Sequence, residues 1–395
     1  MVALSKIGSF IKGICHPPRQ DVTLMKEAGF GWGRIDVPYP YEPDSYGTPN
    51  QSFLDFCARC AWYYEQGIRA MCVSPYPRNF AAAGINPATT EGLEKVRETC
   101  RFIAHELQHL RVAWQVTNEL NVFHFRHPLT LDQCPAFIAA GLQGIRDGTP
   151  NAACGYNTNG IGTSGLSIMH EAKALFGSWL PSEDTTLNDA EILIRGVMPY
   201  HDLVDYIGLD TYRGTWFDGE PEDIIKDAEL AHEITGLPVL LQEFGFSSKG
   251  AILNLQDVNA YIAKLGYNSM HEIVSNPTAF MQSIPPKLAG LISKSPPAEQ
   301  IKTALHLVPH ILKMWPGGSR VYPHTLQGQA DFYDKMLSLV LAHPHICGAF
   351  LYEWTDKEQC FMCHAMDCPC ETDWGIIDRN AQPKPAYHIV KKHFA

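Results

Sequence analysis

Three observations predict an α/β fold for this 395-residue chain and, within that class, a single (β/α)8 TIM barrel. Short apolar, β-branched runs recur along the chain, helical segments lie between them, and about eight such units can be counted. Regular alternation of strand and helix implies a parallel sheet. Eight units favour a closed barrel over an open doubly wound sheet. No glycine-rich phosphate-binding motif follows a strand, so nucleotide-binding folds lose their usual support.

The expected strands are the apolar runs themselves. They lie within residues 6–17, 29–40, 67–77, 110–121, 152–160, 204–214, 237–246 and 345–356. Amphipathic segments such as 91–108 and 221–236 are the helices expected between them. The second of these ends at Gly236 and is followed by Pro238, a typical helix stop before a strand.

One interval breaks the alternation of strands and helices. Residues 247–327 separate the seventh strand from its helix, expected at 329–344, and carry helical patterns at 257–267 and 298–315 with proline-rich stretches between them. Because the interval follows a strand, it should stand over the C-terminal face, where barrel active sites lie. We therefore expect one catalytic domain, 1–395, with a helical insertion at 247–327 that walls or lids the site. A peripheral decoration fits the same pattern.

Composition and charge indicate which kinds of partner the protein does not bind and in which compartment it is expected. A formal net charge of −11 without a basic block argues against nucleic acid or an anionic membrane as a partner. The first residues show no secretory signal pattern, and no apolar stretch is long enough to span a bilayer. Scattered cysteines such as Cys72 and Cys154 are therefore expected to be reduced core thiols. These points favour a cytoplasmic protein.

The strongest chemical signal is a pair of glutamates at strand ends. Glu119 lies in "WQVTNELN" on the fourth strand, and Glu243 lies in "PVLLQEFG" on the seventh. Buried acids are rare unless they are paired, and an internal salt bridge to Arg34 or Arg213 is the alternative interpretation. Strands four and seven place the two acids across the barrel mouth from each other. A retaining glycosidase needs carboxyl groups about 5 Å apart, one as acid/base and one as nucleophile.

In their order along the chain these motifs resemble the clan A glycoside hydrolases, a group of (β/α)8 retaining enzymes. Those enzymes carry an Asn-Glu pair at the end of strand four and a nucleophile glutamate at the end of strand seven. The resemblance runs from about Gly13 to Tyr387 and singles out no family within the clan. It implies that Glu119 is the acid/base, Glu243 the nucleophile and Asn118 a donor to the sugar 2-hydroxyl.

The same resemblance implies roles for three further residues. Tyr212, in "LDTYRG", stands where the clan keeps a tyrosine bonded to the nucleophile. Arg34, in "GRIDVPY", matches an arginine that keeps the nucleophile ionised. Trp354, in "YEWTD", matches a tryptophan that floors the subsite of the reacting sugar. The respective alternatives are an interface aromatic, a structural pair with Asp36 and simple core packing.

Weaker candidates for substrate contacts lie at or just after the expected strand ends. They offer the donors, acceptors and flat apolar faces that hydroxyl-rich substrates require. We expect binding roles for His16, His124 and Trp216, with Tyr76, Asn157, Phe125 and Glu353 as further candidates. For each of them alone, a structural role explains the residue at least as well.

A cysteine cluster is packed into "CFMCHAMDCPC", in the loop after the eighth strand. It can close a tetrahedral, structural zinc site, with His364 as an alternative fourth ligand. The expected ligands are Cys360, Cys363, Cys368 and Cys370. Free or redox-labile thiols and an iron–sulfur cluster are the other interpretations. Hydrolysis by two carboxylates requires no metal, so we expect no catalytic cofactor, only a zinc ion that holds a loop at the pocket rim.

Together these features predict a retaining β-glycosidase that acts on a carbohydrate substrate. A cytoplasmic location favours small oligosaccharides or glycosides and an exo-acting enzyme with a pocket. A metal-dependent barrel hydrolase or isomerase is one alternative, but it needs ligands spread over strand ends, and the first strand offers only His16. A carbohydrate-binding barrel without activity is another, and the presence of both glutamates argues against it.

Overall fold

The computed structural model confirms the predicted barrel and describes residues 9–42, 45–162, 188–269, 272, 278–293 and 300–395. Its parallel strands close in chain order, since β1 (Ile11–Cys15) pairs with both β2 (Trp32–Asp36) and β10 (Ile346–Leu351). The other barrel strands are β5 (Arg69–Val73), β6 (Ala113–Gln115), β7 (Cys154–Asn159), β8 (Tyr206–Thr211) and β9 (Val239–Phe244). Each of the eight expected strand runs contains one of these strands.

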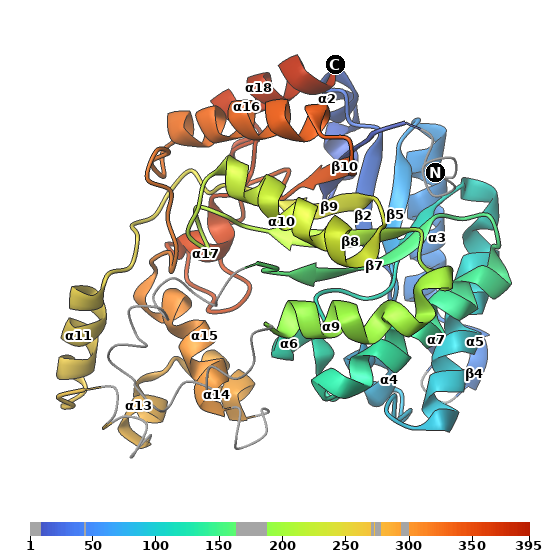
Figure 1. Ribbon diagram of the computed structural model, residues 1–395, viewed down its shortest axis with the longest axis horizontal. Helices are drawn as coiled ribbons and strands as arrows, with labels where there is room; N and C mark the ends of the chain where they lie inside the picture. The colour runs from blue at the N-terminus through green and yellow to red at the C-terminus, as the bar shows by residue number, and fades with distance from the viewer. Residues whose placement is uncertain (1–8, 43–44, 163–187, 270–271, 273–277, 294–299) are drawn as a thin grey trace.

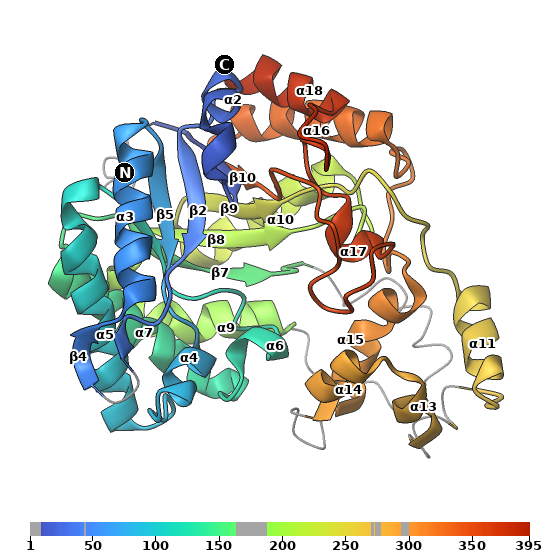
Figure 2. The ribbon, with the colours of Figure 1, turned by 180° about the vertical axis from the view of Figure 1, so that it is seen from behind.

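An outer ring of helices surrounds the strands (Figure 1 and Figure 2). One main helix lies between each pair of successive barrel strands, and a last one follows β10. They are α2 (Val22–Glu27), α3 (Gln51–Glu65), α5 (Thr90–Leu107), α7 (Cys134–Gly148), α9 (Asp189–Val197), α10 (Pro221–Thr235), α16 (Leu326–Ala342) and α18 (Pro385–Phe394). Short helices α4 (Pro77–Ala82) and α6 (Phe123–Arg126) precede α5 and α7. Within the described residues, none of the helices has the length and apolar character that crossing a membrane requires.

The ends of α10 follow the signals in its sequence. Pro221 occupies the first turn, and the Asp223 carboxylate accepts a hydrogen bond from the Glu220 amide at 2.9 Å. Gly236 ends the helix in the left-handed region with a φ of 69°, which confirms the predicted stop. One pair of strands was not predicted, because both are short and polar: β3 (Tyr41–Glu42) and β4 (Ser45–Pro49) form a small antiparallel sheet after β2.

The hydrophobic core has two layers. A small cluster that includes Met71, Tyr206 and Phe350 fills the barrel, and a larger one lies between the strands and the helices. Strands β8, β9 and β10 are buried at every residue, as expected for parallel strands covered on both faces. The interior is tightly filled: a Cβ on Gly13 of β1 would lie 2.2 Å from the Phe350 ring.

Between β9 and α16 the described residues form a group of helices. These are α11 (Leu255–Lys264), α13 (Thr278–Ser283), α14 (Pro286–Ser293) and α15 (Gln300–Leu312), and α11 and α15 fall on the two predicted helical patterns. They share an apolar cluster that includes Ile262, Leu288 and Ile292. Both ribbon views show them on the side toward which the arrowheads of β7 and β8 point (Figure 1 and Figure 2). That this segment walls or lids the site stays a prediction.

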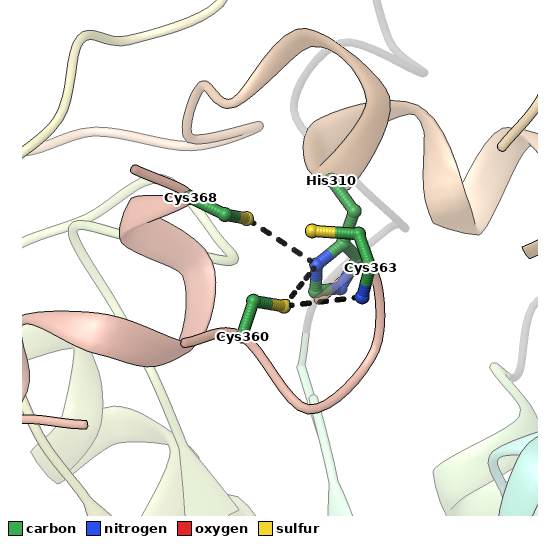
Figure 3. A group of neighbouring side chains, drawn as sticks. All are labelled: His310, Cys360, Cys363 and Cys368. Carbon is green, nitrogen blue, oxygen red and sulfur yellow. Dashed lines mark hydrogen bonds between the residues drawn. The ribbon is translucent and has the colours of Figure 1, made fainter. Parts of the chain in front are cut away.

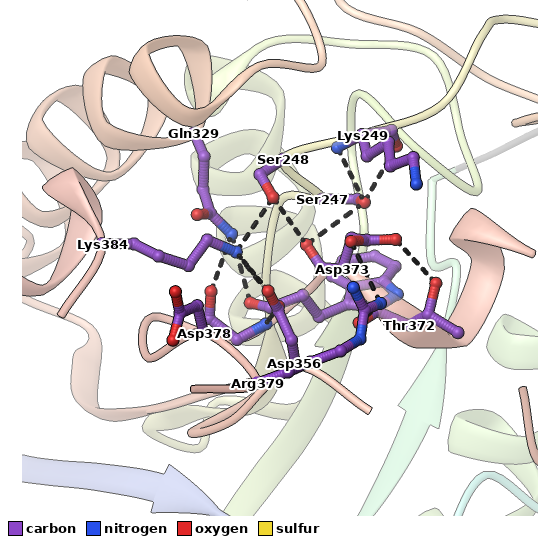
Figure 4. A network of polar contacts seen from close by, with 12 residues as sticks. Ser247, Ser248, Lys249, Gln329, Asp356, Thr372, Asp373, Asp378, Arg379 and Lys384 are labelled. Atoms are coloured by element: carbon purple, nitrogen blue, oxygen red, sulfur yellow. Dashed lines mark hydrogen bonds and ion pairs between the residues drawn. The ribbon is translucent and has the colours of Figure 1, made fainter. Parts of the chain in front are cut away.

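After β10 the chain runs through α17 (Pro369–Thr372), and a polar network ties this stretch to the start of the insertion (Figure 4). Buried Lys384 donates to Asp356 at 3.0 Å and to Ser248 at 2.9 Å. Ser248 in turn donates to the Asp373 carbonyl at 3.1 Å. Burial lowers the pKa of Lys384 and raises the pKa of Asp356 to about 6. The network joins segments 136 residues apart and so holds the region after β10 in place.

Candidate active site

Three carboxyl groups meet where β6, β8 and β9 end. Glu119 follows β6, Asp210 lies on β8 and Glu243 lies on β9, and one oxygen from each lies within 4.8 Å of the others. The three residues are 5%, 1% and 8% exposed, respectively. Buried like charges this close cannot all be ionised, so at least one carboxyl holds a proton. The structure thus brings the two predicted glutamates together and adds an aspartate.

The backbone after β6 is shaped to present neighbouring side chains. Thr117 and Glu119 have φ values of 52° and 43°, in the left-handed region that non-glycine residues rarely adopt. The Thr117 amide donates to Ser74 Oγ at 2.9 Å, and the Glu119 amide donates to Asn157 Oδ1 at 2.8 Å. These bonds hold conformations that cost about 1–3 kcal/mol each. As a result both Asn118 and Glu119 reach the same group of polar side chains.

Each carboxylate oxygen of Glu243 accepts a hydrogen bond from a buried donor. Arg34 Nη1 donates to Oε1 at 2.5 Å, and the Tyr212 hydroxyl donates to Oε2. A buried guanidinium stabilises the ionised carboxylate, and the two donors together hold its orientation. The alternative pairing of a catalytic acid with Arg213 is wrong, because Arg213 forms its ion pair with Asp227 at 2.5 Å.

Arg34 also organises the polar groups beneath Glu243. Its Nε donates to Gln115 Oε1 at 2.7 Å and its Nη2 to Asn118 Oδ1 at 2.6 Å. Gln115 and Asn157 donate to the same Asn118 oxygen, at 3.0 and 2.7 Å. Three donors on Oδ1 fix the Asn118 amide, so that its nitrogen is presented as a donor from the opposite side. Gln115 was missed in the sequence, where its only signal is a polar residue inside the apolar run of the fourth strand.

Glu119 lies in different electrostatic surroundings from Glu243. Burial, followed by the negative charge of Glu243, raises the pKa of Glu119 from its ordinary value of 4.5 to about 7. Hydrogen bonds from Asp210 and Asn159, and the charge of Arg34, act in the opposite direction. A carboxyl with a pKa near 7 can hold a proton at neutral pH and still release it, as a general acid must.

Asp210 was not predicted from the sequence. Burial, followed by the charges of Glu243 and Glu119, raises the pKa of Asp210 well above its usual range. Its Oδ2 accepts a hydrogen bond from Asn157 at 2.5 Å. Its carboxyl also hydrogen-bonds to that of Glu119, which requires one of the two to hold a proton. The available signal was its position, since Asp210 directly follows the run Tyr206–Leu209 and precedes Tyr212 by two residues.

The prediction that Trp354 floors a sugar subsite is wrong. Its ring is fully buried and belongs to the layer between the strands and the helices. Nε1 donates to Asp21 Oδ2 at 2.7 Å, and the ring packs edge-on against Phe30 and Tyr387. A buried indole needs an acceptor for its N–H, and here a carboxylate on the outer side of the barrel supplies it. Trp354 is therefore a core residue.

An aromatic group beside Glu243 is built from other residues. Tyr352 meets the Tyr212 ring edge-on with centroids 5.8 Å apart, and Trp374 meets these two rings at 5.6 and 5.2 Å. His16 lies at the open edge of this group: its ring is 5.7 Å from that of Tyr352, and its side chain is 42% exposed. His16 Nδ1 lies 3.4 Å from the buried carboxylate of Glu353.

The other two predicted substrate residues lie in separate clusters. His124, on α6, lies 3.4 Å from Arg78 Nη1 and packs against Phe125. Phe125 stacks on Tyr76, whose hydroxyl donates to Asp36 at 3.3 Å. Asp36 therefore accepts a hydrogen bond from Tyr76, whereas Arg34 donates to Glu243 and Asn118 and not to Asp36. Trp216 lies in a different cluster, where it packs against the rings of Trp315 and His310.

The cysteine cluster differs from the prediction in one member. Four ligand-type atoms lie within 4.8 Å of one another, and they belong to His310, Cys360, Cys363 and Cys368. Cys370 was expected in this group, but its buried Sγ is directed to the Met314 carbonyl at 3.8 Å. His310 takes its place from α15, 50 residues before Cys360. No spacing rule in the sequence indicates a partner at that separation.

Comparison by sequence finds neither a matching family model nor a matching curated protein. Comparison by structure finds barrels of glycoside hydrolases. A family 1 β-glucosidase from Thermotoga maritima matches with a TM-score of 0.55 at 13% identity, over 95% of this chain and 86% of that one. A variant of GH5_18 from Streptomyces cattleya, in complex with Manb1-4GlcNAc, matches with a TM-score of 0.58 at 13% identity, over 95% and 74%. A family 39 glycoside hydrolase from Bacteroides cellulosilyticus matches with a TM-score of 0.53 at 15% identity, over 98% and 64%.

These similarities show the fold. The resemblance to the clan A glycoside hydrolases is confirmed at that level, because matches include families 1, 5 and 39, and no one family is singled out. The chain spans 64% of the family 39 protein's length and 35% of that of a Bacteroides uniformis β-glucuronidase, which matches with a TM-score of 0.51 at 15% identity over 98% of this chain.

Proposed function

We propose that this protein is a retaining glycosidase that cleaves β-glycosidic bonds, with Glu243 as nucleophile and Glu119 as acid/base. One observation carries the proposal: an oxygen of each carboxyl lies within 4.8 Å of the other. Retaining enzymes keep their carboxyl groups about 5 Å apart, whereas inverting enzymes leave about 6.5–9.5 Å for a water molecule. The raised pKa of Glu119 and the ion pair of Glu243 with Arg34 support the same division of roles.

In the first step, the ionised Glu243 attacks the anomeric carbon while Glu119 transfers its proton to the leaving oxygen. The glycosidic C–O bond breaks as a glycosyl ester bond to Glu243 forms. In the second step, Glu119 is the base that removes a proton from water. The water oxygen bonds to the anomeric carbon, the ester bond breaks, and both carboxyls return to their first states with the sugar configuration retained.

Asp210 is a positioning residue in this scheme, because it acts through Glu119. The Asn157 side chain accepts a hydrogen bond from the Glu119 amide and donates one to Asp210, so it holds both acids in position. Protonated Asp210 donates to the Glu119 carboxyl, and this bond opposes the effect of burial on the pKa of Glu119. Without it, Glu119 would hold its proton too tightly to release it at neutral pH.

The proposed substrates are small β-linked oligosaccharides or glycosides, attacked from one end inside a reducing cytoplasm. The helices α11 to α15 support exo action, since they stand on the side where the barrel strands end. The state of the cysteines supports a reducing compartment. All twelve lie among the described residues, and none is in a disulfide. Oligosaccharides labelled at the reducing end test exo action: a first labelled product that is one sugar shorter than the substrate supports it, and first labelled products of several lengths contradict it.

Nucleophile rescue tests the assignment of the two glutamates. Glu243→Ala should lose hydrolysis of an aryl β-glycoside, and added azide should restore cleavage with an α-glycosyl azide as product. Glu119→Ala, with a substrate that has a good leaving group, should give the β-glycosyl azide instead. Glu229→Ala, an exposed glutamate on α10, is the matched control and should keep full activity. Azide products of the same configuration from both variants would overturn the assignment.

A panel of aryl β-glycosides separates the proposal from its two alternatives. Hydrolysis that survives a chelator supports the two-carboxylate mechanism. Immediate loss of activity on chelation, with the fold intact and no increase in trypsin cleavage within residues 247–327, favours a metal-dependent hydrolase. Silence across the panel, together with measurable sugar binding, favours a carbohydrate-binding barrel.

A further inference from the structure

A second cluster of reactive side chains lies apart from the three carboxyls and has no part in the mechanism proposed for them. Three sulfur atoms surround the His310 imidazole, as Figure 3 shows, and the four ligand atoms lie within 4.8 Å of one another. Three of these side chains come from the loop after β10, namely Cys360, Cys363 and Cys368, and the fourth comes from α15.

The distances in this cluster fit a tetrahedral metal site. His310 Nδ1 lies 3.4 Å from Cys360 Sγ and 3.7 Å from Cys368 Sγ. Zinc bonds of about 2.3 Å to sulfur and 2.0–2.1 Å to nitrogen, at tetrahedral angles, place such a nitrogen and sulfur about 3.6 Å apart. Three thiolates and one imidazole are the donor set that favours zinc among the common divalent ions.

The local backbone is folded around the sulfur atoms. The Cys363 amide points at Cys360 Sγ with a separation of 3.4 Å, and the His364 amide donates to the Cys360 carbonyl at 2.8 Å. The Cys360 amide donates to the Ala365 carbonyl at 3.0 Å, and His364 has a φ of 60°, so the chain turns back on itself. Backbone amides directed at a ligand sulfur are a common feature of metal sites.

Three of the four side chains are buried and Cys363 is half-buried, as suits a structural site near the surface. Cys360 and Cys368 are 0% exposed and His310 is 5% exposed. The two other candidate ligands in the loop lie outside the group of four: Cys370 Sγ is directed to the Met314 carbonyl and, of the four, hydrogen-bonds only to Cys368, and His364 Nε2 contacts Lys287 Nζ.

We propose that His310, Cys360, Cys363 and Cys368 bind one structural zinc ion that fastens the insertion to the loop after β10. All four positions of the tetrahedron are filled by protein, so the ion holds two segments together and does not activate water. An exposed ion pair between Lys313 and Asp367, at 2.6 Å, crosses the same junction and is the weaker link. Trp216 packs on His310, which puts the metal next to a predicted substrate residue.

Metal analysis of the full chain tests the site. The protein as purified, without added metal, should contain one zinc per chain by plasma mass spectrometry. His310→Ala and Cys363→Ser should each lower this content at least five-fold. Cys370→Ser is the matched control, since it removes a buried thiol from the same loop outside the group, and it should keep the full zinc content. Circular dichroism of each variant confirms that the barrel is folded.

Two measurements on the unmutated chain keep the test independent of variant folding. Exchange of zinc for Co²⁺ should give the visible absorption of a tetrahedral site with thiolate charge-transfer bands. Removal of the metal with a chelator should speed cleavage by trypsin within residues 247–327 at least ten-fold, while the barrel stays intact.

Several results would overturn the proposal. Stoichiometric iron with acid-labile sulfide would assign an iron–sulfur cluster instead, and the absence of bound metal at neutral pH would leave a group of thiols. Zinc lost in Cys370→Ser but kept in His310→Ala would show that four cysteines of one loop bind the ion. In that case the insertion would not be fastened by metal.

Discussion

Replacing Glu119 with glutamine tests the electrostatics of the site through stability, independently of any substrate. In the folded protein the pKa of this carboxyl is raised from 4.5 to about 7, first by burial and then by Glu243. The stability that its proton contributes is therefore fully present below pH 4.5 and is lost as the pH rises through 7. Glutamine has the shape of the protonated acid and no charge, so Glu119→Gln should escape this loss.

The size of the effect follows from the two pKa values. At about 1.4 kcal/mol per unit of pKa, the ionised Glu119 destabilises the fold by about 3 kcal/mol at pH 8 and by less than about 1 kcal/mol at pH 5. An unfolding entropy of about 2.1 cal/mol/K per residue over 395 residues is about 0.8 kcal/mol/K. Glu119→Gln should therefore raise Tm at pH 8 by about 3 °C more than it does at pH 5.

Differential scanning calorimetry at pH 5 and pH 8 measures this difference. Glu358→Gln, at an exposed position after β10, is the control and should change Tm equally at both values of pH. An equal change in Tm at both values for Glu119→Gln would refute the reasoning, because it would show that the buried carboxyl is not costly to ionise.

Three further predictions concern single side chains of the site and its surroundings. Tyr212→Phe removes the hydroxyl donor to Glu243. Hydrogen bonds to charged groups contribute about 1.5–3 kcal/mol, so kcat/KM for an aryl glycoside should fall roughly 10- to 100-fold. An unchanged kcat/KM would contradict a role for this hydrogen bond. Trp354→Phe should lower stability in urea by about 2 kcal/mol and leave KM unchanged, whereas a raised KM with full stability would restore its sugar-binding role. Asp210→Ala should move the basic limb of the pH profile of kcat/KM upward, because it removes a bond that lowers the pKa of Glu119. Asp210→Asn keeps a donor and should leave that limb near its original place; a limb unmoved in both variants contradicts the positioning role.

Much of the fold was predictable because each barrel strand is a short, locally marked unit. The strand in "LPVLLQEFGF" is buried on both faces, so it reads as an apolar run without needing any partner to be known. Glu243 stands out in that run because a carboxylate after buried residues has no structural reason to be there. Helix ends such as Gly236 carry their own signal, since its left-handed φ of 69° suits glycine.

The site residues that were predicted wrongly or missed depend on which way a side chain points, which no local sequence pattern shows. Trp354 follows a barrel strand, as a subsite residue would, yet its indole N–H finds Asp21 on the outer side. In the sequence, Asp210 and Gln115 are isolated polar residues in apolar runs. In the folded barrel they bond to Asn157 and Arg34, which come from other strands. Each is explained only by hydrogen-bond partners from other strands.

The sequence by itself determined the barrel, the two glutamates and the presence of a cysteine cluster, because these depend on periodicity and on residue types close together in the chain. Only the tertiary structure decided which groups share one small volume. It added Asp210 to the two glutamates, and it replaced Cys370 by His310 from a helix 50 residues away. The physical reason is that a proton shared by acids and the geometry of metal-ligand atoms depend on distances of a few ångströms between segments that the chain itself keeps far apart.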